Sequence, residues 1–300
     1  MSTRDRATRP TVPTVPTVPT VRTIELSTAT LDYTDTGGTG PVLLLLHGPL
    51  LDHAVWDAVI ARLPELRCVA PTLPLGAHRH PAPRDELTNA SLARMVAELM
   101  DALDLRDVTL VLNDWGGAQV LVELGLDARV TRLALVACEA FDNVPAGRPG
   151  RMLARAARIP GALALQAQLA RLPAVRRRLA STMAARPVPD ALLRRWFAPF
   201  RDPSVRADLR RFSARFPVPA DRDWSAGLGA FPGPALVAWA DDDRMMPPEH
   251  GPRLARLLPD AELVHVPAAA TLVPLDQPDL LAGHLRALVR RAPTDHGGTT

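Results

Sequence analysis

The sequence predicts an α/β fold with a mostly parallel central sheet flanked by helices and an inserted all-helical cap. Continuous apolar runs alternate with amphipathic helical segments, the alternation stops after residue 140, and it resumes near residue 234. Apolar strands separated by helices are typical of a parallel sheet that is covered on both faces. At 300 residues and 47% hydrophobic content, the chain is long and apolar enough to bury such a core.

The first part of the predicted core spans residues 23–141. It opens with a hairpin at "TIEL" and "TATLDYTD", and continuous apolar runs then predict strands at 41–48, 66–71, 107–114 and 128–140. A helical segment is expected from His53 to Leu63, and an amphipathic helix at 91–105 follows a polar "TNA" capping signal. The order of strands and helices therefore predicts parallel pairing.

Residues 142–228 contain Arg, Ala and Leu at helical spacing, punctuated by Pro and Gly, and predict the helical cap. The second part of the core, residues 229–292, is expected to hold strands at 234–243 and 261–267 and helices at 247–259 and 277–292. Residues 1–22 carry a Thr-Val-Pro repeat that blocks helix and strand ladders, so this tail and residues 293–300 are predicted to be disordered.

Charge and composition exclude several classes of protein. All 35 basic residues are Arg, but they are interspersed with acidic residues and the net charge is only +3, which argues against a nucleic-acid binder. No uncharged apolar stretch has the length of a membrane span, and the N-terminus lacks the apolar region of a secretory signal. Cys68 and Cys138 lie in apolar runs, as expected of buried thiols. We expect a cytoplasmic monomer or homodimer that binds a small-molecule substrate and neither nucleic acid nor membrane.

The segment "VLNDWGGAQ" places a carboxylate, Asp114, at the end of an apolar strand and before a pair of glycines. A carboxylate in a buried strand is costly unless it is paired. Two explanations remain open: Asp114 caps the following helix, or it is a reactive group held on a tight turn between strand and helix. A helix N-terminus beside such a turn favours anionic chemistry.

The segments "LLLLHG", "NDWGG", "LVAWADDD" and "VPAAATLVPLDQP" occur in an order that resembles the α/β-hydrolase fold superfamily, over about residues 23–292. "NDWGG" is similar to the branch of haloalkane dehalogenases and epoxide hydrolases, which use an aspartate nucleophile. The resemblance implies that Asp114 attacks a small apolar electrophile (an epoxide, a haloalkane or an ester-like compound) and forms an enzyme ester, with no metal or organic cofactor. It implies that the Trp115 backbone N–H faces the oxyanion and that the Trp115 indole holds a halide, whereas a packing role is the alternative.

The resemblance also implies an acid that orients a catalytic histidine. Asp243 matches the commoner place and Glu139 the alternative one, although Glu139 also fits a simple carboxylate at the rim of the site. Thr271 stands where the family has its histidine, and a threonine hydroxyl has no useful basicity near neutral pH. Pro49 stands where a backbone N–H normally serves the oxyanion, and proline has none. Both departures weaken hydrolysis of the ester.

Three histidines are candidates for a substitute base: His53, His78 and His80. A surface or loop role is the alternative for each of them. The leading hypothesis is a hydrolase with an atypical or impaired base step, and its rival is a non-hydrolytic ligand-binding protein on the same scaffold. A lyase or isomerase in which Asp114 accepts a proton would require burial to raise the pKa of that carboxyl group.

Overall fold

The computed structural model describes residues 20–83, 87–215 and 223–292. Its centre is an eight-stranded sheet in the order β1-β2-β4-β3-β5-β6-β7-β8. β1 pairs antiparallel with β2 and β2 with β4, while all other neighbours are parallel. The strands are β1 (Val21–Glu25), β2 (Thr30–Asp35), β3 (Val42–Leu46), β4 (Arg67–Pro71), β5 (Val108–Asp114), β6 (Val130–Cys138), β7 (Ala235–Ala240) and β8 (Ala261–Val266). The predicted fold class is confirmed.

The N-terminal boundary of the fold differs from the prediction. Val21 and Arg22 were assigned to a disordered tail, but both belong to β1, where they pair with Thr34 and Tyr33 of β2. The β2 partner strand supplies a ladder that the repeat itself cannot form, and Val21 is β-branched and suits it. Most of the predicted N-terminal tail and the predicted tail at 293–300 lie outside the described residues.

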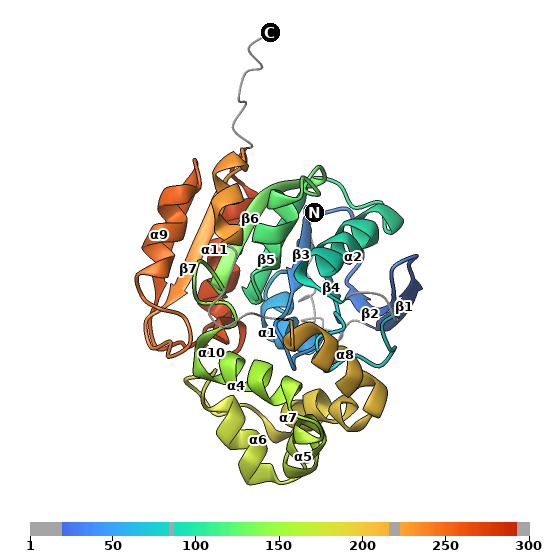
Figure 1. Cartoon of the computed structure of the whole chain (residues 1–300). Coiled ribbons are helices and arrows are strands. Elements are labelled where there is room, and N and C mark those ends of the chain that lie inside the picture. The colour runs from blue at the N-terminus through green and yellow to red at the C-terminus, as the bar shows by residue number, and fades with distance from the viewer. Residues whose placement is uncertain (1–19, 84–86, 216–222, 293–300) are drawn as a thin grey trace, which may run out of the picture.

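Helices form two groups around the sheet. One group contains α1, α10 and α11, which contact one another, and the other joins α2, α3, the short 3-10 helix η3 and α9. Figure 1 shows α2 in front of the sheet and α11 behind it. α2 begins as the sequence predicts, because Thr88 and Ser91 form a reciprocal capping box. The bounds are η1 (His53–Trp56), α1 (Asp57–Ile60), α2 (Asn89–Ala102), α3 (Gly117–Glu123), η3 (Trp224–Ala230), α9 (His250–Leu257), α10 (Val273–Asp276) and α11 (Pro278–Val289).

A run of helices is inserted between β6 and β7. In the described part of residues 142–223 we find helices and no strand, in agreement with the sequence. Figure 1 shows these helices as a separate layer at the end of the sheet toward which the arrowheads of β5 and β7 point. The inserted helices are α4 (Gly147–Arg158), α5 (Ala162–Leu169), α6 (Pro173–Ala180), α7 (Asp190–Phe197), η2 (Pro199–Arg201) and α8 (Pro203–Ser213).

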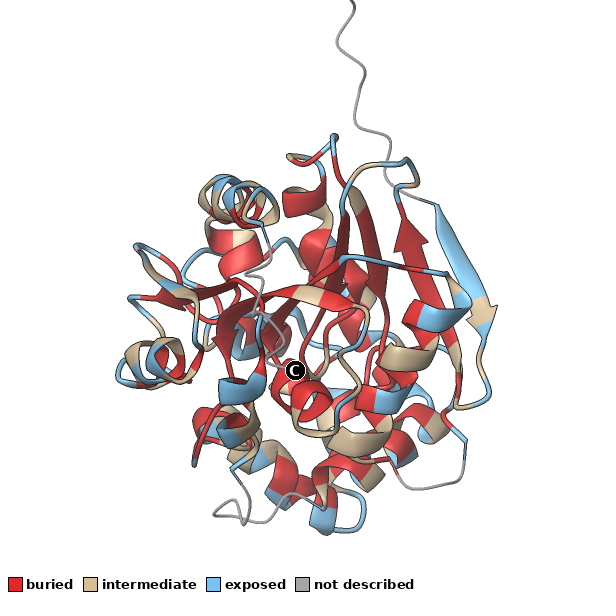
Figure 2. Cartoon of the chain, turned by 90° about the horizontal axis from the view of Figure 1, so that it is seen from above, coloured by how far each residue is buried: buried red, intermediate tan, exposed pale blue. Residues whose placement is uncertain are grey.

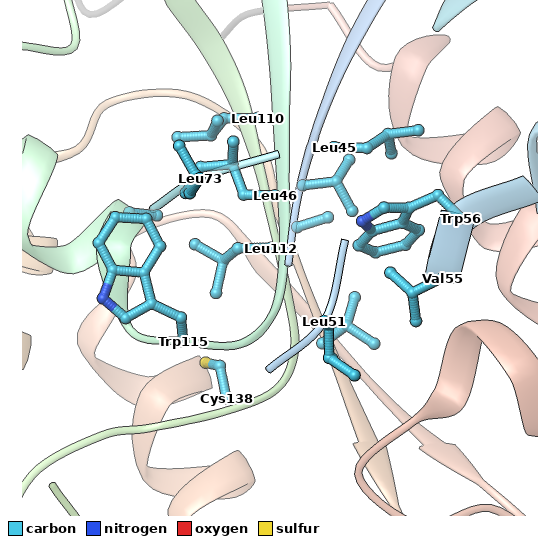
Figure 3. Packing of buried hydrophobic residues seen from close by; sticks show 14 of the residues in the cluster. Leu45, Leu46, Leu51, Val55, Trp56, Leu73, Leu110, Leu112, Trp115 and Cys138 are labelled. Carbon is cyan, nitrogen blue, oxygen red and sulfur yellow. The ribbon is translucent and has the colours of Figure 1, made fainter. Parts of the chain in front are cut away.

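The core is centred on β3 and β5, whose residues are all buried. Figure 2 shows the inner strands as buried and β1 as the exposed edge of the sheet. In Figure 3 Leu46 of β3 and Leu112 of β5 lie between Trp115 on one side and Trp56 on the other. Cys68 and Cys138 are free and buried, as predicted, and burial raises the pKa of Cys68 to about 12.

Candidate active site

The turn after β5 presents Asp114 in a strained conformation. Asp114 has a φ of 70°, in the left-handed region that side chains other than glycine rarely adopt. The Trp115 N–H donates to the Asn113 carbonyl at 2.9 Å and closes a three-residue turn around Asp114. The next helix, α3, has Gly116 as its N-cap and no side-chain capping bond. Asp114 therefore does not cap the helix, and strain of this kind points to a functional constraint.

The carboxyl group of Asp114 lies directly against Gly48. A Cβ atom at Gly48 would stand only 2.0 Å from Asp114 Oδ2, so only glycine fits at this position. Asp114 is 3% exposed, and its side chain makes no hydrogen bond or ion pair with any described residue. An unpaired buried carboxylate is expensive, and this one has no evident structural purpose.

Two further carboxyl groups adjoin Asp114. Burial raises the pKa of Asp114 well above its usual value, and the charges of Glu139 and Asp243 raise it further. Burial also raises the pKa of Glu139 to about 7, although its Oε1 accepts from the Ala146 N–H at 2.9 Å. The pKa of Asp243 is raised by burial as well. The structure thus brings Glu139 and Asp243 close enough to Asp114 for their charges to raise its pKa.

Thr271 joins this group through its hydroxyl. Thr271 is fully buried, and its Oγ1 donates to Asp243 Oδ1 at 2.9 Å. Its carbonyl oxygen accepts from the Asn113 side-chain amide at 2.6 Å, which ties the loop after β8 to the turn after β5. Sequence reasoning did not single out Asn113. A polar side chain inside an apolar strand must find a partner, and that signal could have identified it.

The indole of Trp115 is bonded to the start of α2. Its Nε1–H donates to Asn89 Oδ1 at the start of α2, at 2.9 Å. The ring lies over Gly117, where a Cβ atom would stand 2.2 Å from Trp115 Cζ3. The proposed halide contact of this indole is therefore wrong, because its only N–H is already bonded within the core. The alternative interpretation, a packing role, is the one that the structure supports.

The backbone donors expected near the oxyanion are either missing or already bonded. Pro49 has no N–H, and the next residue, Leu50, donates its N–H to the Leu75 carbonyl at 2.8 Å. The Trp115 N–H is committed to Asn113, so the prediction that it faces an oxyanion is also wrong for this conformation. In well-studied hydrolases the loss of a single donor costs about 3 kcal/mol of transition-state stabilisation.

The three candidate histidines are engaged elsewhere. His53 contacts Thr72 Oγ1 at 2.8 Å and Arg195 at 2.6 Å, and burial lowers its pKa to about 4, so it is neutral at pH 7. His78 contacts Asp208 of α8, and His80 contacts Asp32 of β2. The structure gives none of the three a contact with Asp114, and the charges that act on Asp114 are those of acids.

His47, in the "HG" turn, is a structural residue. Its Nδ1 donates to the Gly48 carbonyl at 2.8 Å, and its Nε2 accepts from the Leu73 N–H at 2.9 Å. Burial lowers the pKa of His47 to about 4, so the neutral ring with a proton on Nδ1 satisfies both bonds. This ring holds the chain that presents Gly48 to Asp114.

The central sheet and the position of Asp114 at the end of its middle strand can now be compared with known proteins. A family model described as alpha/beta hydrolase fold matches residues 41–278. The chain belongs to the alpha/beta hydrolase fold family. The match covers both parts of the core and the inserted helices between them.

Individual relatives of this alpha/beta hydrolase carry different activities in their names. Haloalkane dehalogenase 2 of Mycobacterium bovis is 28% identical, over 85% of this chain and 90% of that protein. A cis-3-alkyl-4-alkyloxetan-2-one decarboxylase of Xanthomonas campestris is 26% identical, over 88% of this chain and 93% of that protein. A local match of 91 residues to a haloalkane dehalogenase of Mesorhizobium japonicum is 36% identical and spans only 29% of that protein.

Solved structures share the architecture. A haloalkane dehalogenase of Agrobacterium tumefaciens superposes with a TM-score of 0.74 at 21% identity, covering 91% of this chain and 98% of that one. Likeness at this level of identity shows the fold and not the reaction. Within the described residues, no three His, Cys, Asp or Glu side chains are grouped as a metal site, and no helix is long and apolar enough to cross a bilayer.

Proposed function

We propose that this alpha/beta hydrolase uses the Asp114 carboxylate to attack a small apolar electrophile, such as a haloalkane, an epoxide or a strained ester, and hydrolyses the product ester slowly. The observation that carries the proposal is the Asp114 carboxyl group, strained at the end of the central strand and free of any bond to the described residues. A structural carboxylate would be paired. The names of the dehalogenase and oxetanone relatives agree with an electrophile of this kind.

In the first step, an Asp114 oxygen forms a bond to carbon while the carbon–halogen or carbon–oxygen bond breaks. The electron pair leaves with the halide, or stays on the opened ring oxygen. This step requires the carboxylate to be ionised, and its raised pKa keeps it protonated at low pH. The rate of ester formation is therefore expected to rise with pH through the pKa of the folded protein.

In the second step, water must attack the ester and lose a proton. Thr271 donates its hydroxyl proton to Asp243 and offers no basic nitrogen, and the three candidate histidines are bonded elsewhere. The enzyme ester is therefore expected to accumulate. Release of alcohol or diol should be much slower than formation of the ester.

Intact-mass measurement tests the proposal. The protein is incubated with 1-bromohexane, 1,2-epoxyhexane and a dialkyl oxetan-2-one, because these probes cover the three electrophile classes. We expect an adduct that persists in the parent protein and is absent from Asp114→Asn. If neither an adduct nor a product forms with any probe, Asp114 is not a nucleophile and the proposal fails.

The companion variant is Thr271→His, which restores an imidazole beside Asp243. We expect it to shorten the lifetime of the adduct while leaving the rate of its formation within a few-fold of the parent, since the first step does not use this residue. An unchanged lifetime in a folded variant would contradict the assignment of Thr271 to the position of the base.

A second candidate function is reversible binding of a ligand without chemistry. It is favoured by the lack of free N–H donors near Asp114. Pro49 has no N–H, and the Leu50 and Trp115 N–H groups are both bonded to backbone carbonyls. A site without oxyanion donors binds a ligand as readily as a site that has them, but catalyses poorly. Calorimetric binding of the same probes, with their masses and that of the protein unchanged, would favour this function over the first.

A further inference from the structure

The inserted helices carry most of the large hydrophobic side chains that are exposed among the described residues. Seven large hydrophobic side chains are exposed in the described residues. Six of them lie on α4, α5, α6 and their connections, with exposures between 44% and 64%, and the seventh is Val21 of β1. These six are Met152, Ile159, Leu165, Leu169, Leu172 and Leu179. Single exposed apolar side chains are normal in any protein, but a group within 28 residues of the sequence indicates a binding surface.

Four of these side chains follow one another along α5 and α6. Leu165 and Leu169 are one helical turn apart, and Leu172 comes three residues later, with its N–H donating to the Leu169 carbonyl at 3.0 Å. Leu179 lies two turns after Leu172 on α6 and therefore on the same side of that helix. Figure 1 shows α5 and α6 at the outer end of the inserted layer, away from the sheet.

The same segment is strongly basic. Residues 143–189 contain nine of the 35 Arg and none of the 32 acidic residues, so they carry a formal charge of +9 while the rest of the chain carries −6. Arg148, Arg155, Arg171 and Arg178 are exposed and make no ion pair with any described residue. Arg171 and Arg178 directly precede Leu172 and Leu179 and all four are exposed, so charged and apolar side chains alternate along this segment.

Contrary to the expectation from the whole sequence that the protein binds no membrane, we propose that this surface, formed by α4, α5 and α6 and their Arg and Leu side chains, docks the protein on an anionic phospholipid bilayer. Helices that lie in a bilayer interface combine an apolar side with Arg or Lys on the polar side. Arg binds lipid phosphate, and leucine side chains enter the boundary between headgroups and acyl chains. The negative remainder of the chain would orient the inserted helices toward the bilayer.

Other occupants fit the surface less well. A nucleic acid would use the Arg side chains and leave the leucines in water. A second copy of the same surface would bury the leucines but would bring two segments of charge +9 together, which is unfavourable. The described residues contain no helix able to cross a bilayer, so the contact is peripheral.

Sedimentation of the full chain with lipid vesicles tests the proposal. We expect binding to vesicles of phosphatidylcholine mixed with phosphatidylglycerol, weak binding to phosphatidylcholine alone, and release as salt is raised. Equal recovery in the supernatant with both kinds of vesicle would overturn the proposal. The test does not depend on the chemistry of Asp114, so the docking and the proposed reaction can fail independently.

Charge variants test the contribution of Arg. Arg171→Gln combined with Arg178→Gln is expected to weaken binding to the anionic vesicles about 25-fold, at about fivefold for each charge near the surface. Arg94→Gln combined with Arg290→Gln removes the same charge from two exposed positions outside the inserted helices and is the matched control. Equal losses in the two pairs would mean that only net charge matters, and would overturn the assignment of this surface.

Variants of the exposed leucines distinguish insertion of these side chains into the bilayer from electrostatic attraction of Arg to the anionic lipids. Leu165→Ser combined with Leu172→Ser keeps every charge and removes two exposed leucines, so a substantial loss of binding is expected while helix content and unfolding stay unchanged. Binding as tight as that of the parent would overturn insertion of the leucines. A parent dimer in analytical ultracentrifugation that the same variant abolishes would assign the surface to a second copy and also overturn the proposal.

Discussion

At Gly48 the absence of a side chain is what lets the Asp114 carboxyl group occupy its position. A methyl group there would stand 2.0 Å from Asp114 Oδ2 and 2.6 Å from its Cβ, so the whole aspartate would have to move. We expect Gly48→Ala to destabilise the protein by about 1–3 kcal/mol and to suppress the proposed adduct formation, since overpacking displaces the Asp114 carboxyl group. Urea unfolding and intact mass measure the two effects.

Gly283→Ala is the matched control for this change. Gly283 lies in α11 and has open space around its Cα, so the added methyl group meets nothing within 4 Å. Alanine favours a helix over glycine by about 1 kcal/mol, so Gly283→Ala should be neutral or stabilising. Adduct formation in Gly48→Ala at the parental rate would show that the proposed reaction of Asp114 does not need this close approach.

Glu139 couples stability to pH. Its pKa is about 7 in the folded protein against a usual value of 4.5, because burial disfavours its charge. Below the usual value both states are protonated and the folded state carries no penalty. As pH rises from 4.5 to 7 the unfolded state ionises first, so stability is lost, by about 3 kcal/mol in all.

Glu139→Gln removes this dependence while keeping an oxygen that can accept from the Ala146 N–H. The free energy of unfolding of the variant minus that of the parent is expected to increase by about 3 kcal/mol from pH 4.5 to pH 7.5. The two proteins are compared with each other because His47 and His53 change the stability of both in the opposite direction over the same pH range. Subtracting the two pH profiles removes this shared contribution. Parallel pH profiles of the two proteins would contradict the raised pKa.

At the scale of elements, the sequence predicted most strands closely and the contacts between distant elements poorly. β3 and β5 are continuous apolar runs that only a strand buried on both faces can use, so their bounds could be read within a residue or two. The link from Asp52, before η1, to Arg195 on α7 joins residues 143 positions apart. Nothing local in the sequence specifies such a pair.

Asp52 and Arg195 attach the inserted helices to the core. Asp52 is buried and accepts from Arg195 and from the Trp196 indole, while Arg195 also contacts His53. We expect Arg195→Met to cost about 1–2 kcal/mol, because it leaves a buried carboxylate short of a partner; the value is kept low since Arg195 is a third exposed. Urea unfolding and limited proteolysis of the inserted helices report the loss.

Arg194→Met provides the matched control on the same helix. Arg194 is exposed and pairs with Asp190 one turn earlier, an arrangement worth about 0.3–0.5 kcal/mol. The inserted helices should therefore be released more readily in Arg195→Met than in Arg194→Met. If the two variants unfold alike, the contact with Asp52 does not attach these helices.

At the scale of the whole molecule, parallel pairing explains why the candidate site could be predicted at all. Asp114 ends β5, Glu139 follows β6 and Asp243 follows β7, and neighbouring parallel strands finish at one edge of the sheet. The order of the strands alone therefore predicts that the three acids lie close together. The direction of the Trp115 indole and the partners of the backbone N–H groups depend on side-chain packing around Gly117 and Asn89, which strand order does not determine.

The position of β1 at the edge of the sheet determines how far the chain can be shortened from its N-terminus. Backbone pairing begins at Val21, so a chain that starts at Thr20 keeps every ladder contact of β1 and should unfold within about 0.5 kcal/mol of the full chain. Starting at Ser27 removes β1 and leaves β2, with its buried Leu31 and Tyr33, as the open edge. An uncovered edge strand exposes unpaired backbone groups and promotes association. Thermal unfolding and light scattering should thus separate the two truncations, and equal stability of both would mean that β1 contributes nothing to the fold.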